Sequence, residues 1–146
     1  MPGFLLSIFR TAMTTITKIA VPTQGRPAFL PRHFGMPTTM LIEASIYTQL
    51  SRLCPAYQGG LWDFYDLTNG GCFMAPHTEE TLRLANAMND SDATISAEAA
   101  GIVACLYTFS HLAFRPGMAH IGEHFHWLRE FALEHPESAA ILALID

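Results

Sequence analysis

The sequence predicts an α+β fold, with a small antiparallel sheet of three to four strands packed against about four helices. The 146 residues suffice for one domain with a sizeable core. Apolar residues recur at helical spacing on both sides of a middle region that is rich in aromatic residues and turn signals. A helix, a group of strands and then more helices is the order typical of helices packed on one face of a small sheet.

The first 28 residues are predicted to be a poorly ordered extension, so that residues 29–146 form a single domain. The extension is rich in threonine and ends in a stretch punctuated by proline and glycine. Pro31 and Pro37 then bracket residues 32–35. Because proline interrupts helical hydrogen bonding, we expect an ordered loop here rather than a helix.

The first predicted helix begins near Thr38 or Thr39, either of which can cap its N-terminus, and ends before Pro55. Glu43 in the first turns and Arg52 in the last turn have the signs that the helix dipole favours. The apolar positions recur at helical spacing: Ile42, Ile46, Leu50 and Leu53.

The middle of the chain predicts a β-hairpin. Residues 61–67 are rich in aromatic side chains, and residues 72–75 form the returning strand, which Pro76 ends. Between them, Asn69-Gly70 is the strongest short hairpin signal, because both residues tolerate a positive φ.

The remaining residues predict two further strands and three helices. The strand pattern is weaker here than in the hairpin, whereas the helices have clear start and stop signals. In chain order the predicted elements are strands over residues 81–87 and 94–95, a helix from Ser96 to about residue 114, a helix over residues 118–134 and a short helix starting at Pro136.

Formal charge is unevenly distributed along the chain. The net charge is −5, but residues 1–42 contain four basic residues and no acid, whereas residues 43–146 carry −9. A nucleic-acid-binding domain needs a stripe of basic residues, and residues 43–146 contain none. We therefore expect no direct DNA binding.

Cysteine content favours a reducing, cytoplasmic environment. The three cysteines, Cys54, Cys72 and Cys105, are odd in number and form no C-x-x-C pair. This pattern predicts neither a disulfide framework nor a thiolate zinc site. The longest stretch without a charged residue, 99–114, is too short to span a bilayer, so we expect no membrane association.

One short motif suggests metal chemistry. His120, Glu123 and His124 match H-x-x-E-H, in which two histidines one helical turn apart hold zinc and the glutamate activates water. Such a site needs a third protein ligand well downstream, but only 22 residues follow His124. We interpret the motif as an exposed helix face and expect no cofactor. A small metal-dependent hydrolase using these three residues is the alternative.

The sequence contains no nucleophile motif or phosphate-binding loop. The candidate functional residues are therefore polar side chains that can contact a partner. Arg32-His33 can recognise a carboxylate or phosphate through the fork geometry of arginine. Asp63 and Asp66 lie three apart on a predicted strand and should point to opposite faces. Acidic residues near the C-terminus form a further candidate patch. The predicted contact residues are Arg32, His33, Asp63, Asp66, Glu137 and Asp146.

Several strings of residues, in this order, resemble one known family. They are LPRHFG at 30–35, LCPAYQGGLWDFY at 53–65, LTNGGCFMAP at 67–76, ISAEAAGIV at 95–103 and the terminal Ile145-Asp146. Together they are similar to the ArdB/KlcA family of antirestriction proteins over about residues 29–146. Cys72 is a departure, since the family more often has an aromatic residue there.

The resemblance implies a protein of plasmids, phages or genomic islands that spares incoming DNA from type I restriction-modification enzymes of the host. It implies contact with the restriction complex, with its translocating restriction subunit as the expected target, and no catalytic residues. A whole-protein DNA mimic is disfavoured, because one turn of B-DNA carries on the order of twenty phosphates. The chain has only thirteen acidic residues.

Overall fold

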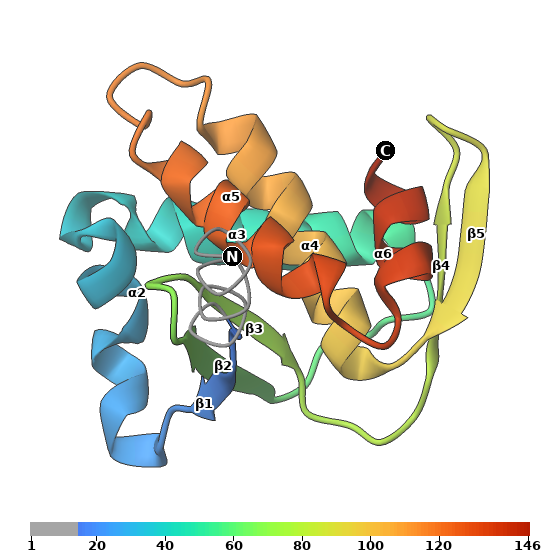
Figure 1. Cartoon of the computed structure of the whole chain (residues 1–146), viewed down its shortest axis with the longest axis horizontal. Coiled ribbons are helices and arrows are strands. Elements are labelled where there is room, and N and C mark those ends of the chain that lie inside the picture. The colour runs from blue at the N-terminus through green and yellow to red at the C-terminus, as the bar shows by residue number, and fades with distance from the viewer. Residues whose placement is uncertain (1–14) are drawn as a thin grey trace, which may run out of the picture.

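The computed structural model describes residues 15–146 and shows helices packed around two small groups of strands (Figure 1). The predicted α+β class is therefore confirmed, with five α-helices among the described residues. In chain order the elements are β1 (Lys18–Ala20), the 3-10 helix η1 (Thr23–Gly25), α2 (Arg26–Phe34), α3 (Met36–Leu53), β2 (Trp62–Leu67), β3 (Cys72–Pro76), β4 (Leu82–Asn86), β5 (Ser91–Ile95), α4 (Ala97–Leu112), α5 (Ile121–Leu133) and α6 (Ser138–Ile145).

The strands divide between two antiparallel sheets. One has the order β1-β2-β3, with Lys18 opposite Leu67 and Asp66 opposite Cys72. The other is the β4–β5 ribbon, which lies beside α6 and away from the first sheet (Figure 1). Pro76 is the last residue of β3, and beyond it the His77 N–H still donates to the Leu61 carbonyl at 2.8 Å before the chain leaves the first sheet.

Helix α4 lies at the centre of the hydrophobic core. The hydroxyl of Ser96 caps it by accepting a hydrogen bond from the Ala99 N–H at 3.1 Å. Most of its side chains are buried, and it packs against β3, α3, α5 and α6. A helix that is apolar on nearly all sides is typical of a buried core helix. No helix among residues 15–146 is both long and apolar enough to cross a membrane.

The structure corrects the predicted start of the domain. Residues 18–20 pair with β2, and the Val21 N–H donates to the Phe64 carbonyl at 2.8 Å. The sheet thus includes residues that the sequence predicts to lie in an extension. A strand of three residues is too short to show the alternation that identifies strands. The part of the predicted extension before residue 15 lies outside the described residues.

The predicted loop over residues 32–35 is also wrong, because helix α2 continues to Phe34. Pro27 lies in the first helical turn, where no intrahelical N–H is required, and Pro31 removes one internal hydrogen bond. Gly35, with φ of 84°, then separates α2 from α3. Burial of three apolar side chains, roughly 2 kcal/mol each, offsets the lost bond: Phe29, Leu30 and Phe34.

Candidate functional site

Three of the predicted contact residues meet where α2 packs on β2. The guanidinium of Arg32 donates two hydrogen bonds to the Asp66 carboxylate, at 3.2 and 3.1 Å. Nε2 of His33 lies 2.6 Å from Oδ1 of the same carboxylate. The stacked rings of Phe29 and Phe64, with centroids 5.1 Å apart, fix α2 against the strand. We refer to Arg32, His33 and Asp66 as the ion-pair cluster.

The charges in the ion-pair cluster follow from burial and hydrogen bonding. Burial acts to raise the pKa of Asp66, but hydrogen bonds from His33 and Arg32 outweigh it and lower the pKa below its ordinary value. Burial lowers the pKa of His33, against the opposing effect of Asp66. At neutral pH, Asp66 is therefore a carboxylate, and a neutral His33 donates to it through Nε2.

His124 lies directly beside the ion-pair cluster. It comes from α5 and is only 5% exposed. Its Nε2 donates to the backbone carbonyl of His33 at 3.1 Å, and its Nδ1 lies 3.9 Å from Sγ of Cys72. Burial is the main reason that the pKa of His124 is lowered to about 4. The imidazole is therefore neutral over the physiological pH range.

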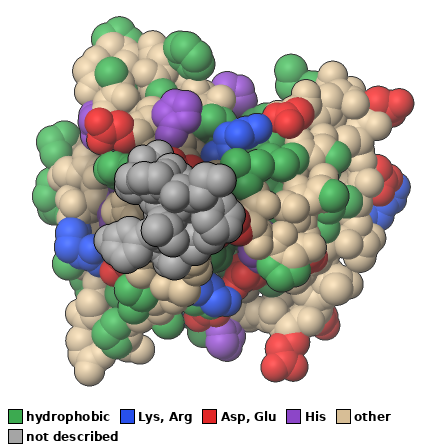
Figure 2. Space-filling model, viewed as in Figure 1, with side chains coloured by type: hydrophobic (Ala, Val, Ile, Leu, Met, Phe, Trp, Pro, Cys, Tyr) green, Lys and Arg blue, Asp and Glu red, His purple; other side chains and the backbone are tan. Residues whose placement is uncertain are grey.

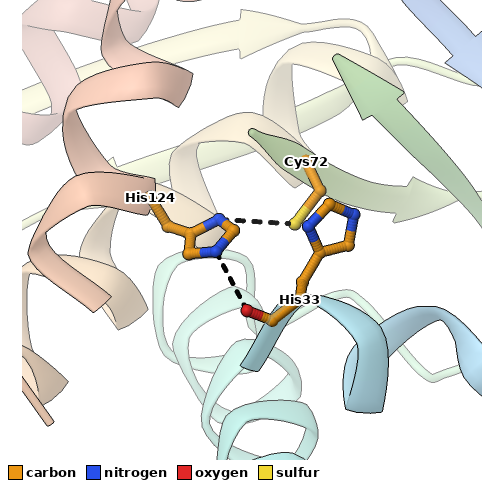
Figure 3. A group of neighbouring side chains, drawn as sticks. All are labelled: His33, Cys72 and His124. Atoms are coloured by element: carbon orange, nitrogen blue, oxygen red, sulfur yellow. Dashed lines mark hydrogen bonds between the residues drawn. The ribbon is translucent and has the colours of Figure 1, made fainter. Parts of the chain in front are cut away.

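Three elements that are distant in sequence bring His33, Cys72 and His124 together (Figure 3). One potential ligand atom from each residue lies within 4.8 Å of the other two. Cys72 is fully buried in β3, and burial raises the pKa of its thiol well above the ordinary value. These three residues, called the His-Cys-His cluster below, are the ones that can supply ligands to a metal ion.

The His-Cys-His cluster differs from the metal site that the sequence motif suggests. His120 is exposed at the N-cap position of α5, and Glu123 is exposed in the first turn. Only His124 of the three motif residues points into the protein. Sequence reasoning missed His33 and Cys72 as its neighbours because no local spacing links residues on three separate elements.

The other predicted contact residues lie apart from the ion-pair cluster. Asp63 accepts from Arg26 at 3.4 Å and contacts Nδ1 of His77 at 2.8 Å. In the β2–β3 register, Asp63 lies opposite Ala75, whereas Asp66 lies opposite Cys72. Because side chains alternate along a strand, the two aspartates lie on opposite faces, as predicted.

Glu137, one of the predicted acidic residues near the C-terminus, is hydrogen-bonded within the fold. Its carboxylate accepts hydrogen bonds from the backbone N–H and the hydroxyl of Ser96, so it supports the start of α4. Asp146 is exposed at the end of α6. Glu137 therefore has a structural contact that explains its position.

Comparison with known proteins identifies the family. The sequence model described as "Antirestriction protein" matches residues 55–146. The chain belongs to this antirestriction family.

Relatives of the antirestriction family match nearly the whole chain. The uncharacterized protein YafX of Escherichia coli K12 is 46% identical over 134 residues, covering 90% of this chain and 88% of YafX. The antirestriction protein KlcA of Escherichia coli is 38% identical over 135 residues, covering 90% of this chain and 95% of KlcA. The family resemblance drawn from the sequence is thus confirmed.

A solved structure shows that the fold is shared within the antirestriction family. It comes from a study of KlcA and ArdB that describes a novel fold and antirestriction activity against type I DNA restriction systems in vivo but not in vitro. The TM-score is 0.85 at 37% identity, with 91% of this chain and 96% of the other chain covered.

Acidic side chains of this antirestriction-family protein are interleaved with basic ones. Figure 2 shows acidic groups scattered over the face in view, with basic groups among them. Several acids are neutralised in ion pairs, as in Lys18–Glu98, Arg26–Asp63, Arg32–Asp66 and Arg83–Asp92. Part of the acidic charge of the described residues is therefore balanced by neighbouring basic groups.

Proposed function

We propose that this protein protects incoming DNA from type I restriction by binding the host restriction complex, without catalysing a reaction. The likeness to the KlcA/ArdB structure carries this proposal, because a TM-score of 0.85 at 37% identity extends over nearly the whole of both chains. The proteins of that study act against type I systems in vivo.

Contact with protein is favoured over competition for a DNA site. B-DNA presents one negative charge per roughly 1.7 Å of helix axis. This chain has thirteen acids in all, and at least four of them are held in ion pairs with lysine or arginine. The charge pattern supports recognition of a protein surface that itself carries both signs.

We place the contact surface at the exposed side of the ion-pair cluster. The side chain of Arg32 is 49% exposed and that of Asp66 is 29% exposed, so both remain accessible while they hold each other in position. Asp63 and Asp146 are proposed as outlying contacts, and Glu137 as a weaker one because Ser96 occupies its carboxylate. The proposed partner is the translocating restriction subunit, in the bacterial cytoplasm where restriction takes place.

Plating of unmodified phage on a type I restricting strain, with and without this gene, tests the proposal. A host lacking the restriction subunit is the control, and methylation of phage DNA by the same enzyme complex is scored in parallel. Rescued plating with methylation intact is expected, since blocking translocation leaves the methylating subunits active.

Two outcomes would overturn this proposal in different ways. Rescue accompanied by loss of methylation would indicate competition for the DNA site of the whole complex. No rescue in any restricting host would reject an antirestriction role for this chain.

A further inference from the structure

Hydrogen bonding fixes the tautomers of the two histidines in the His-Cys-His cluster. A backbone carbonyl can only accept, so Nε2 of His124 carries the hydrogen that it shares with the His33 carbonyl. Nε2 of His33 donates to the Asp66 carboxylate at 2.6 Å, a much shorter contact than the 3.4 Å to Arg32. Both Nδ1 atoms are therefore left with a free lone pair.

Both lone pairs are directed towards the same sulfur atom. Nδ1 of His124 lies 3.9 Å from Sγ of Cys72, and Figure 3 shows a ring nitrogen of His33 turned to the sulfur from the other side. A thiol has one hydrogen and can donate it to one acceptor only. Three electron-pair donors thus converge with a single proton among them. A cation at this point would bind all three electron-pair donors.

We propose that His33, Cys72 and His124 form a binding site for one zinc ion. Two imidazole nitrogens and one thiolate are the ligand set that zinc and other thiolate-preferring metals favour, whereas magnesium and calcium take oxygen ligands. Bonds of about 2.3 Å to sulfur and about 2.0 Å to nitrogen place neighbouring ligands about 3.5 Å apart. The observed separations, 3.9 Å for the Cys72–His124 pair and at most 4.8 Å in the cluster, require shifts of about an ångström.

The surroundings already provide outer partners for both histidine ligands. A histidine that binds a metal usually donates its second N–H to a carboxylate or a backbone carbonyl, which orients the ring. Asp66 has this position for His33, and the His33 carbonyl has it for His124. Arg32 in turn holds Asp66.

The hydrogen bonds leave each histidine ready to bind a metal. Nε2 carries the ring hydrogen in both, towards the His33 carbonyl in His124 and towards Asp66 in His33, so neither Nδ1 has to lose a proton. The Cys72 thiol loses one proton to solvent as the sulfur–zinc bond forms. Affinity is therefore expected to increase with pH, with about one proton released per ion.

Cobalt(II) is the probe for this site, because a thiolate–cobalt bond gives a charge-transfer absorption that zinc then abolishes. The full-length protein is treated with a chelator, kept reduced with a phosphine rather than a thiol, and titrated with cobalt(II). One ion per chain is expected, displaced by one equivalent of zinc, with a rise in the melting temperature. The experiment needs no restriction assay, so it is independent of the antirestriction proposal.

Matched variants show which residues bind the ion. Cys72→Ala and His124→Gln are expected to abolish the charge-transfer band, and Asp66→Asn to weaken affinity roughly 10- to 100-fold. Cys54→Ala is a matched control, because Cys54 is also a free and buried cysteine but lies outside the cluster. His120→Gln is the second control and should bind normally.

Three results would overturn the site. They are absence of cobalt and zinc binding in the folded protein, a band that persists in Cys72→Ala, and loss of the band in His120→Gln. Circular dichroism of each variant establishes that it is folded. If Cys72→Ala does not fold, His33→Gln, at a less completely buried position, gives the same test.

Discussion

At Gly101 the backbone of α4 approaches β3 so closely that no side chain fits between them. A Cβ built at this position would lie 2.4 Å from the Met74 carbonyl oxygen and 2.5 Å from Cα of Ala75. Both are backbone atoms, so relief would require the helix to move away from the sheet. We expect Gly101→Ala to lower the free energy of unfolding by about 3 kcal/mol, measured by denaturant titration.

Gly122 is a suitable control for this substitution, because it is also a helical glycine. A Cβ there would lie 3.8 Å from Cβ of Ala113, an ordinary contact. Gly122→Ala should therefore leave stability unchanged or raise it by up to about 1 kcal/mol through helix propensity. Equal losses in both variants would show that the close approach of α4 to β3 is not the cause.

His124 makes stability depend on pH in a defined window. Its pKa in the folded protein, about 4, lies below the ordinary value of 6.5. Between these values the unfolded chain binds more protons, so stability falls as the pH drops from about 6.5 to 4. Without metal, the loss should be on the order of 3 kcal/mol, measured by denaturant unfolding at a series of pH values in the presence of chelator.

The variant His124→Gln isolates this effect, because glutamine does not titrate. It should unfold more easily at pH 7 but show a shallower decline between pH 6.5 and 4. Asp66, whose pKa is lowered, contributes only at more acidic pH and remains in the variant. An unchanged slope would assign the pH dependence to other groups.

At the residue scale, the sequence predicted part of the site. The proline-bracketed segment indicates Arg32 and His33 as candidates, and the predicted strand indicates Asp66. All three residues belong to the ion-pair cluster. The strand pattern predicts Cys72 only as a residue of the hairpin, and the H-x-x-E-H motif groups His124 with His120 and Glu123, which are exposed. Contacts between separate elements depend on packing, which local spacing does not encode.

At the scale of elements, the start of α4 depends on a shared cap. Ser96 accepts from the Ala99 N–H, and Glu137 accepts from both the N–H and the hydroxyl of Ser96. Ser96→Ala should cost about 1 kcal/mol of unfolding free energy. Glu137→Ala should cost about 1–2 kcal/mol, since hydrogen bonds to a charged group are lost.

A double-mutant cycle distinguishes this shared cap from two independent contacts. Ser96→Ala combined with Glu137→Ala should cost less than the sum of the single changes, by about 1 kcal/mol. Thermal or denaturant unfolding of the four proteins measures the difference. Strict additivity would mean that the two side chains do not act together.

Elements with strong local signals were predicted well. Helix α3, the β2–β3 hairpin and α4 agree with the sequence analysis because apolar spacing, Asn69-Gly70 and the Ser96 cap are all local. Helix α2 was missed because tertiary burial outweighs the effect of Pro31. Division of the strands between two sheets was missed because pairing partners are chosen by the whole fold.

For the whole molecule, the ion-pair cluster connects the structure with the proposed function. Arg32→Ala removes the exposed guanidinium, and a pair of this kind stabilises the fold by at most about 1 kcal/mol. We expect the variant to remain folded but to give less rescue of unmodified phage than the unchanged protein, at equal protein level.

Arg83→Ala is the matched control, because Arg83 also forms an exposed ion pair with an aspartate, Asp92, on the β4–β5 ribbon. It should rescue phage as well as the unchanged protein does. If both variants lose activity equally, the contact surface is not at the ion-pair cluster. If neither loses activity, Arg32 has no part in recognition.

The pairing of β1 with β2 has a consequence for the order of folding. Lys18 lies opposite Leu67, so this edge closes a long loop, whereas a short turn joins β2 to β3. Contacts distant in sequence form more slowly than local ones. We therefore expect the hairpin to form early and β1 to dock late. On the ribosome, β1 emerges first but has no strand to pair with until Leu67 has been synthesised.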